Sequence, residues 1–256
     1  MEREALYDLL ERLWDRYDRE EFIADDPIAV PHRFTSRDDR EIAGFLAATI
    51  AWGSRPVIVR NGLRMMRFLD DAPCDFVRNA SERELATLAP FVHRTFNGGD
   101  LIHFIRAIRA MYARHGGLGR FVEASYAATG DMRRVLAAFR EEFFRTEHPA
   151  RCGKHVSSIE RGASCKRLCM YFRWMVRRDE RGVDFGEWRT IPPAALYMPL
   201  DLHSGTMARA LGLLGRRQND WRAVEELTAA LRTFDAGDPV RYDFALFGAG
   251  IDGFLK

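Results

Sequence analysis

Apolar residues recur at steps of three and four along most of the chain, which is the period of an α-helix that buries one face. Residues 1–17 are the clearest case, with leucines and aromatic residues on one side of the predicted helix and charges on the other. The same spacing predicts helices over residues 37–51, 57–69, 81–88, 99–115, 118–126, 132–145, 165–178, 204–214, 220–232 and 239–248. Strand-like alternation is nearly absent, so we predict an all-α fold of roughly nine to eleven helices.

Helix-breaking and helix-capping residues separate these segments. Pro27 and Pro31 interrupt residues 25–35, and the run 52–56 separates two predicted helices in a helix–turn–helix arrangement. Caps or first-turn prolines are expected at Asp100, Asp131, Ser164, Asp220 and the Asp238-Pro239 pair. No internal repeat and no Gly/Ser-rich linker marks autonomous domains in this sequence.

The composition excludes several classes of protein. The 256 residues are 47% hydrophobic and 30% charged, which is typical of a folded globular chain and excludes disordered and collagen-like proteins. The longest nearly apolar run, residues 42–52, is too short to cross a bilayer, and the first thirty residues alternate acids and bases, unlike a signal peptide. We therefore expect a cytoplasmic protein with no membrane association.

Charge is distributed unevenly along the chain. The net charge of +2 names no partner, but residues 151–181 hold nine Lys or Arg against three acids, a local net charge of +6. On charge alone, two interpretations fit this segment equally. It forms either a surface that faces a polyanion or a solvated helix face with counterions.

The four cysteines, Cys74, Cys152, Cys165 and Cys169, predict neither a disulfide framework nor a metal site. Cys165 and Cys169 lie four residues apart and share the apolar side of a predicted helix. This placement fits a buried pair of small apolar residues better than metal ligation. We expect no bound metal.

One lysine has an unusual place for its charge. Lys166 lies in the first turn of the predicted helix 165–178, beside its apolar stripe. The positive end of the helix dipole disfavours a second positive charge there, which favours the neutral amine that a nucleophile requires. The alternative is a lysine whose alkyl stem lies on the core and whose ammonium reaches solvent.

A second polar site precedes the predicted helix 204–214. In the segment Pro199-Leu200-Asp201-Leu202-His203, the carboxylate of Asp201 can accept hydrogen bonds from helix amides and remain ionised. The alternative is a plain helix cap without a chemical role. His203 fits either a phosphate ligand or a turn residue.

These residues carry a resemblance to a known superfamily. The segment 199–203, with Arg209 and the Leu211-Gly212-Leu213 exit, resembles the catalytic-aspartate segment of the helix-hairpin-helix DNA glycosylase superfamily (HhH-GPD). Lys166 then resembles the lyase lysine of that superfamily, and its interval of 35 residues to Asp201 is similar to that of the archaeal 8-oxoguanine glycosylase branch. The chain also resembles a bacterial family of the superfamily over nearly all of residues 37–251, most clearly in 91–97, 166–177 and 238–248.

The resemblance implies a two-lobed helical fold with an active-site cleft between the lobes. Residues 1–36 and 200–256 are expected to form one lobe, and residues 37–199 the central lobe that carries the lysine helix. The hairpin is atypical, because residues 158–164 hold a single glycine where the superfamily has Leu-Pro-Gly-Val-Gly. Lys154, Arg161 and Arg167 are the expected substitutes for its phosphate-binding amides. No cysteine follows Cys169, so the iron–sulfur cluster of endonuclease III relatives is not expected.

Further site residues follow from the same comparison. Trp52 stands in the inter-helix turn where glycosylases place a wedge that fills the gap left by an extruded base, although it fits a residue that caps the core equally well. Ser54 and Arg55 of this turn, with His203 and Arg209, are expected DNA contacts. The candidate walls of a base pocket are Phe172, Trp174 and Trp188.

The implied function is a DNA glycosylase with AP-lyase activity. Such an enzyme flips a damaged base out of duplex DNA, and neutral Lys166 attacks the sugar C1′ while Asp201 stabilises positive charge and assists proton transfers. We expect 8-oxoguanine as the substrate, no cofactor, and a nucleoid-associated monomer. The alternatives are a non-catalytic module of the same fold that binds DNA or structured RNA, and an all-α scaffold for protein partners.

Overall fold

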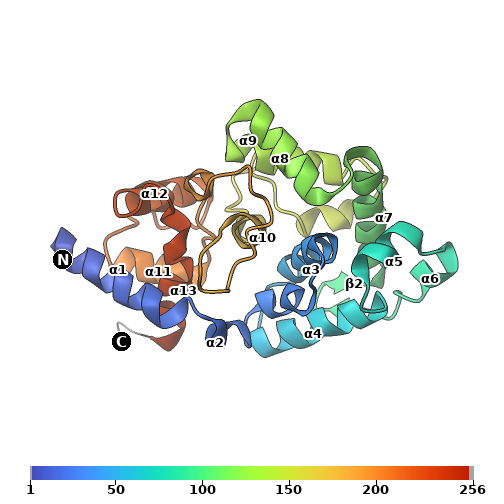
Figure 1. Ribbon diagram of the computed structural model, residues 1–256, viewed down its shortest axis with the longest axis horizontal. Helices are drawn as coiled ribbons and strands as arrows, with labels where there is room; N and C mark the ends of the chain where they lie inside the picture. The colour runs from blue at the N-terminus through green and yellow to red at the C-terminus, as the bar shows by residue number, and fades with distance from the viewer. Residues whose placement is uncertain (1, 254–256) are drawn as a thin grey trace. The chain divides into compact units, whose positions relative to one another are not determined.

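The computed structural model describes residues 2–253 and confirms the all-α fold (Figure 1). Thirteen α-helices and one two-stranded hairpin form the regular structure of these residues, with short 3-10 helices between them. Met1, at the start of the first predicted helix, and residues 254–256 lie outside the described range. The chain divides into two compact units: Met1–Phe22 with Ser158–Lys256, here the terminal unit, and Ile23–Ser157, here the central unit.

The central unit is built around α3 (Arg37–Thr49), which is buried from Glu41 to its end. Phe45 of this helix packs against the rings of Phe104, Phe139 and Phe143, with centroids 5.3–5.8 Å apart. The surrounding helices are α4 (Arg55–Phe68), α5 (Pro73–Asn79), α6 (Glu82–Ala86), α7 (Gly98–His115), α8 (Leu118–Thr129) and α9 (Met132–Phe143). The 3-10 helices η1 (Pro27–Ala29) and η2 (Pro31–Arg33) pack on α3, and η3 (Ala150–Lys154) follows α9.

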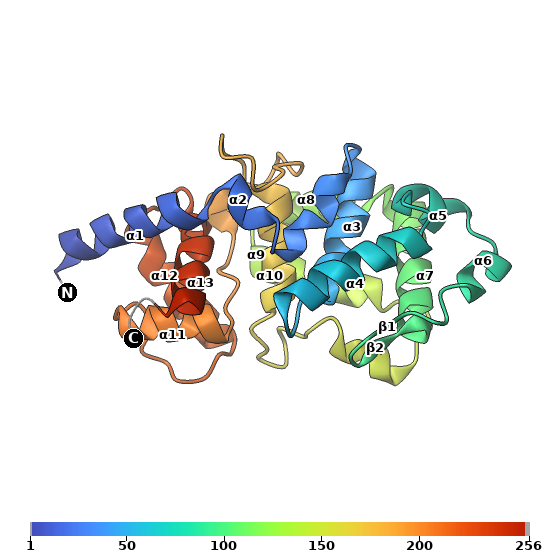
Figure 2. The ribbon, with the colours of Figure 1, turned by 90° about the horizontal axis from the view of Figure 1, so that it is seen from below.

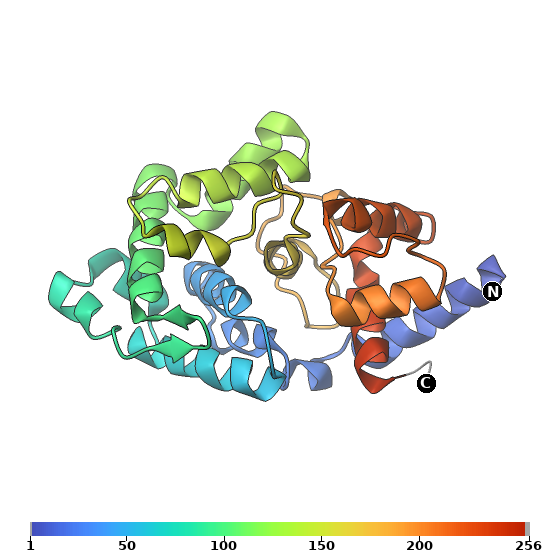
Figure 3. The same ribbon diagram turned by 180° about the vertical axis from the view of Figure 1, so that it is seen from behind.

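A short hairpin lies beside α4 in the central unit (Figure 2; Figure 3). Strand β1 (Val92–His93) pairs antiparallel with β2 (Phe96–Asn97), so that Val92 is opposite Asn97 and His93 is opposite Phe96. Arg94 in the turn has a left-handed φ of 53°. Two residues per strand are too few for an alternating pattern, so the hairpin was not predicted from the sequence.

The terminal unit contains α1 (Arg3–Tyr17), α10 (Lys166–Val176), α11 (Leu202–Ala210), α12 (Trp221–Arg232) and α13 (Asp243–Asp252), and α2 (Glu20–Ile23) continues the chain into the central unit. Helix α13 packs against both α1 and α11. Glycines allow this close approach: Gly248 faces the ring of Tyr17, and a Cβ on Gly250 would lie 2.7 Å from the carbonyl oxygen of His203. Gly248 thus sets the distance between α1 and α13, and Gly250 sets that between α11 and α13.

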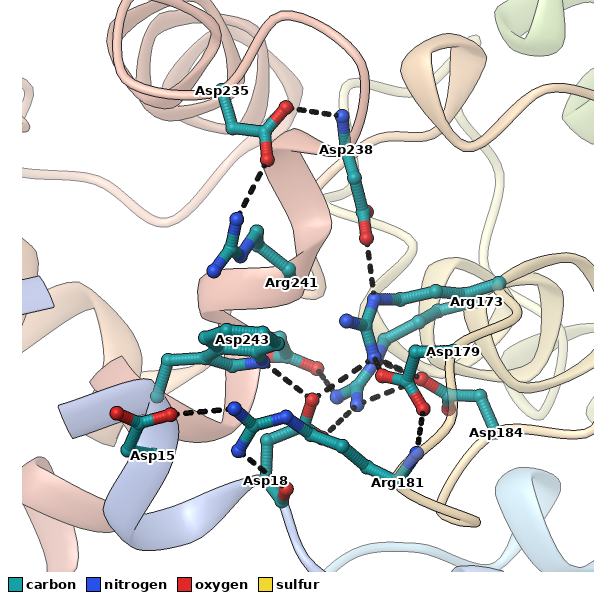
Figure 4. A network of polar contacts seen from close by, with 12 residues as sticks. Asp15, Asp18, Arg173, Asp179, Arg181, Asp184, Asp235, Asp238, Arg241 and Asp243 are labelled. Atoms are coloured by element: carbon teal, nitrogen blue, oxygen red, sulfur yellow. Dashed lines mark hydrogen bonds and ion pairs between the residues drawn. The ribbon is translucent and has the colours of Figure 1, made fainter. Parts of the chain in front are cut away.

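Two buried arginines anchor α10 in the terminal unit (Figure 4). The guanidinium groups of Arg173 and Arg177 donate charged hydrogen bonds to aspartates from three other segments. The partners are Asp18, Asp184, Asp238 and Asp243, at distances of 2.7–3.4 Å. Burial lowers the pKa of each guanidinium, but the neighbouring carboxylates more than reverse this and raise it, so both arginines stay charged.

This network decides to which unit the lysine helix belongs. The units divide after Phe22 and after Ser157, not at the expected boundaries 36/37 and 199/200. Asp18 follows α1 and Asp243 begins α13, so the arginines of α10 bind it to the terminal helices. Lys166 and Asp201 therefore belong to the same unit, whereas the sequence interpretation assigned them to different lobes.

The same contacts change the interpretation of the basic segment 151–181. Arg173 and Arg177 are buried among carboxylates, and Arg181 pairs with Asp15 of α1. The local charge of +6 counted only neighbours in sequence, whereas most of these aspartates lie outside the segment. Residues 151–181 therefore do not form one basic surface.

Most predicted helices are present, with ends shifted by a few residues. The segment predicted over 239–248 is a 3-10 helix, η5 (Pro239–Tyr242), followed by α13, which extends to Asp252. Helix α5 was not predicted, because its seven residues are too few for a clear apolar period. Asp100 is not a cap itself but the third helical residue of a capping box that starts at Asn97.

No helix within residues 2–253 combines the length and the apolar run needed to cross a membrane.

Candidate active site

Lys166 and Asp201, which the sequence separates by 35 residues, lie side by side in the terminal unit. Lys166 is the first residue of α10, and Asp201 is the N-cap of α11. Lys166 Nζ lies 3.7 Å from Asp201 Oδ2, which is within ion-pair distance but longer than a hydrogen bond. The side chains are 23% and 22% exposed, so the pair is partly shielded and still open to a ligand.

The two oxygens of Asp201 have different partners. Oδ1 accepts hydrogen bonds from the backbone N–H groups of His203 at 2.8 Å and Ser204 at 3.0 Å. The Ser204 hydroxyl in turn accepts from the Asp201 N–H at 3.0 Å, and Asn219 Nδ2 donates to the Asp201 carbonyl at 2.8 Å. The helix N-terminus thus fixes the orientation of the carboxylate through Oδ1. Oδ2 is left to face Lys166.

The start of α10 has an unusual backbone. Cys165, not the expected Ser164, occupies the N-cap position, with a left-handed φ of 50° and no side-chain cap. Before it, residues 159–162 form a turn in which Gly162 has a φ of 77°. The Gly162 carbonyl accepts the backbone N–H of Trp221 at 2.9 Å, which ties this turn to the start of α12. The segment expected as an atypical hairpin is therefore a turn held against another helix.

Phe247 of α13 completes the surroundings of the pair. Its ring centroid lies 5.8 Å from Lys166 Nζ, and its ring meets that of His203 edge-on at 5.9 Å. A ring beside an amine replaces water on one side of it. Phe247 was not predicted as a site residue, although it lies in the segment 238–248 that carries part of the resemblance. His203 itself is exposed.

Asp243 connects this site to the arginine network. It begins α13 one turn before Phe247 and is 5% exposed. Burial raises the pKa of Asp243 to about 6; Arg173 opposes this rise most strongly, followed by Lys166, whereas Asp201 adds to it. The charges of Lys166 and Asp201 therefore reach the buried network through Asp243.

One family model matches most of the chain. The family described as "Protein of unknown function (DUF2400)" matches residues 26–252, a range that includes Lys166, Asp201 and Phe247. The chain belongs to this family. No curated protein and no solved structure matches the chain. The resemblance of this DUF2400 member to HhH-GPD glycosylases stays a prediction.

The aromatic residues expected to wall a base pocket are core residues instead. Phe172, Trp174 and Trp188 are at most 1% exposed. Phe172 and Trp174 belong to the buried side of α10, and the ring of Trp188 meets that of Phe172 edge-on at 5.3 Å. The backbone N–H of Trp188 donates to the Met175 carbonyl at 2.8 Å, which holds the loop that follows α10 against this helix. Their faces are covered by protein and are not available to a base.

Two of the expected DNA contacts, Arg209 and Arg167, are half-buried, and Arg209 has an internal role. Arg209 donates to the Arg216 carbonyl at 2.8 Å and to Asn219 Oδ1 at 2.6 Å, so it braces the loop that follows α11. Arg167 is half-buried, and burial lowers its pKa to about 10. Lys154 and Arg161 are exposed, at the end of η3 and in the turn before α10, and their contact with DNA stays a prediction.

The expected wedge residues belong to the central unit. Trp52 is half-buried between two histidines, edge-on to His93 at 5.0 Å and stacked with His155 at 5.9 Å. These contacts favour the interpretation of Trp52 as a residue that caps the core. Ser54 is exposed at the N-cap of α4, and Arg55 is the half-buried first residue of that helix.

Proposed function

We propose that this protein is a DNA glycosylase with AP-lyase activity, in which Lys166 is the nucleophile and Asp201 accepts its proton. The observation that carries the proposal is the 3.7 Å approach of Lys166 Nζ to Asp201 Oδ2, while Oδ1 is held by the helix N-terminus. A carboxylate with a fixed orientation beside a partly shielded amine is the arrangement that an amine nucleophile requires.

The choice of residue supports a reaction at this amine. The chain contains 36 arginines and three lysines, Lys154, Lys166 and Lys256. A guanidinium stays protonated and is not a nucleophile, whereas an amine can lose its proton. An arginine would bind Asp201 through two hydrogen bonds and would make the stronger structural ion pair. A lysine at position 166 therefore favours chemistry over a purely structural role.

The proposed reaction has three steps. The neutral Nζ of Lys166 attacks C1′ of a damaged nucleotide, the C1′–N bond breaks, and the base leaves with the bonding electrons and takes up a proton. Asp201 removes a proton from Nζ and delivers it to the ring oxygen O4′, so that the sugar ring opens to a Schiff base. Loss of a C2′ proton then expels the 3′ phosphate, which cleaves the strand.

The substrate class is the less constrained part of the proposal. We propose an oxidised purine, 8-oxoguanine, because the interval between Lys166 and Asp201 is similar to that of the archaeal 8-oxoguanine glycosylases. The exposed His203 and the ring of Phe247 border the pair and are the residues that a bound nucleotide would meet first.

Borohydride trapping tests the proposal. Borohydride reduces a Schiff base to a stable amine, so an active lysine becomes cross-linked to DNA. Wild-type protein is incubated with duplexes that carry 8-oxoguanine, other damaged bases or an abasic site, beside the Lys166→Gln protein and the matched Lys256→Gln control. We expect cross-links with wild type and Lys256→Gln and none with Lys166→Gln. Cross-links that persist in Lys166→Gln would refute the assignment.

The alternative is a DNA-binding module without covalent chemistry. It predicts salt-sensitive binding of duplex DNA by all three proteins and no cross-link on any lesion. That outcome would reject the lyase and leave DNA binding in place.

A further inference from the structure

Helix α4 of the central unit carries an uncompensated positive charge that the glycosylase proposal does not use. Between Glu41 and Asp70 the chain has no acidic residue. The charged residues in this interval are Arg55, Arg60, Arg64 and Arg67, all of them on α4.

Three of these arginines share one exposed face of the helix. Arg60, Arg64 and Arg67 are spaced by four and three residues, so they lie on one side and rise by about 10 Å along the axis. The buried residues of α4 are Ile58, Gly62, Met65 and Met66. Gly62 lets the helix lie close to Val30, since a Cβ there would be 2.7 Å from Val30 Cγ2. The buried side is thus fixed against η1 and its neighbours, and the arginines face outward.

No carboxylate within residues 2–253 pairs with Arg60, Arg64 or Arg67. Arg64 has a ring contact alone, with its Cζ 5.4 Å from the centroid of Phe68. Asp71, which follows the helix, pairs instead with Arg33 at 3.7 Å. The charge of this face is therefore not neutralised, in contrast to the buried arginines of α10.

A fourth arginine extends the row beyond the start of α4. Arg94, in the turn of the hairpin, is exposed, and its guanidinium lies against Gly53, two residues before the helix. A Cβ on Gly53 would be 2.7 Å from Arg94 Nη1, and the φ of 104° at this position favours glycine. From Gly53 to Arg67 the row spans about 20 Å, the length of several phosphates on one strand. Figure 2 shows the hairpin beside α4.

We propose that Arg60, Arg64, Arg67 and Arg94, here the α4 basic face, bind the phosphate backbone of duplex DNA. The choice of duplex DNA rests on the proposed function. Guanidinium groups match phosphate oxygens through paired hydrogen bonds, and a row of them without acids is the electrostatic footprint of a nucleic acid. A membrane surface is disfavoured, because the exposed large apolar side chains of the described residues are Tyr7, Val92, Leu202 and Ile251, and Val92 alone lies near the α4 basic face.

The expected effect follows from counterion release. Each phosphate that a cation neutralises contributes about 0.9 to the slope of log affinity against log salt concentration. Replacing three arginines by glutamine should therefore reduce the magnitude of this slope by about two to three.

The test compares two triple variants with the same change in charge. Arg60→Gln/Arg64→Gln/Arg67→Gln alters the α4 basic face. The control, Arg83→Gln/Arg120→Gln/Arg134→Gln, alters exposed positions on α6, α8 and α9 of the same unit. Fluorescence anisotropy measures binding of a lesion-free duplex over a series of potassium chloride concentrations, and circular dichroism checks that each variant is folded. We expect the slope to fall in the first variant and to stay close to wild type in the control.

Equal slopes in wild type and the α4 variant, or equal losses in both variants, would overturn the inference. The inference would also be overturned if the α4 variant changed the salt dependence of binding for single-stranded RNA but not for duplex DNA. The proposed function fails separately. If wild type forms Lys166-dependent cross-links and the α4 variant binds normally, the inference fails and the function stands. If DNA binding depends on the α4 basic face and no lesion is trapped, the inference stands and the proposed function fails.

Discussion

Removing Arg173 should destabilise the protein in a way that depends on pH. This side chain is fully buried and donates to Asp243, Asp184 and Asp18 (Figure 4). In Arg173→Met the hydrophobic stem is retained and the guanidinium is lost. Asp18 and Asp184 then keep only Arg177, and Asp243 loses its ion-pair partner. Removing one partner of a buried ion pair costs about 3–5 kcal/mol, and we expect a loss of this size in the free energy of unfolding at pH 7.

The pKa of Asp243 gives this loss its sign with pH. The pKa of Asp243 is raised from an ordinary 3.8 to about 6 in the folded protein, so folding favours its protonated form. The stability that protonated Asp243 contributes is therefore present below about pH 4 and is lost as the pH rises through about 6. Without Arg173 the folded pKa rises further, so Asp243 holds its proton to higher pH. At 1.36 kcal/mol per pKa unit, the variant should recover about 1–2 kcal/mol relative to wild type between pH 7 and pH 5.

Urea denaturation followed by tryptophan fluorescence measures the effect at pH 5 and pH 7. Arg222→Met, an exposed position on α12 in the same unit, is the control and should change the free energy of unfolding by less than about 0.5 kcal/mol. A stability of Arg173→Met close to wild type at pH 7 would contradict the role of the network. A loss of equal size at both pH values would contradict the assignment of the titration to Asp243.

Two further predictions concern α11 and its packing. Gly250→Ala should lower the free energy of unfolding by about 1–3 kcal/mol, because the new Cβ meets the backbone of His203. The control Gly153→Ala, whose Cβ would lie 3.5 Å from Arg140 Nη2, should change this free energy little. Similar free energies of unfolding for both variants in chemical denaturation would refute the close packing. Asp201→Asn should keep the helix cap, since asparagine caps as well as aspartate, and should still slow base excision by orders of magnitude, whereas Asp201→Ala should also cost about 1 kcal/mol of stability. An unchanged single-turnover rate in Asp201→Asn would leave Asp201 as a cap alone.

The helical framework could be predicted from the sequence because each helix repeats its own apolar period. The pair Lys166 and Asp201 was also within reach, since each stands at the start of a helix where its charge has a local consequence. What the sequence could not reveal is their separation of 3.7 Å, which depends on how α10 and α11 pack. Phe247 was missed for the same reason, because an aromatic residue in an apolar helix has no local sign of its neighbours.

Errors in the sequence interpretation arose where partners lie far apart along the chain. Arg173 and Asp18 are 155 residues apart, so a charge count over a short window placed buried arginines on a surface. Phe172 and Trp174 follow the helical stripe of α10, and that stripe is the core of the unit rather than a pocket. The uncompensated arginines of α4 have a sign in the sequence itself, namely the 28 residues 42–69 without an acid.

The central claim is that Lys166 is the amine that reacts with DNA. After borohydride reduction with an abasic duplex, nuclease treatment and proteolysis, mass spectrometry identifies the peptide that carries the sugar adduct. Because the chain has three lysines, the adduct can be assigned to one of them or to the amino terminus. The account predicts the adduct on Lys166 and its absence in Lys166→Gln. An adduct on Lys154 or on the amino terminus, retained in Lys166→Gln, would contradict it.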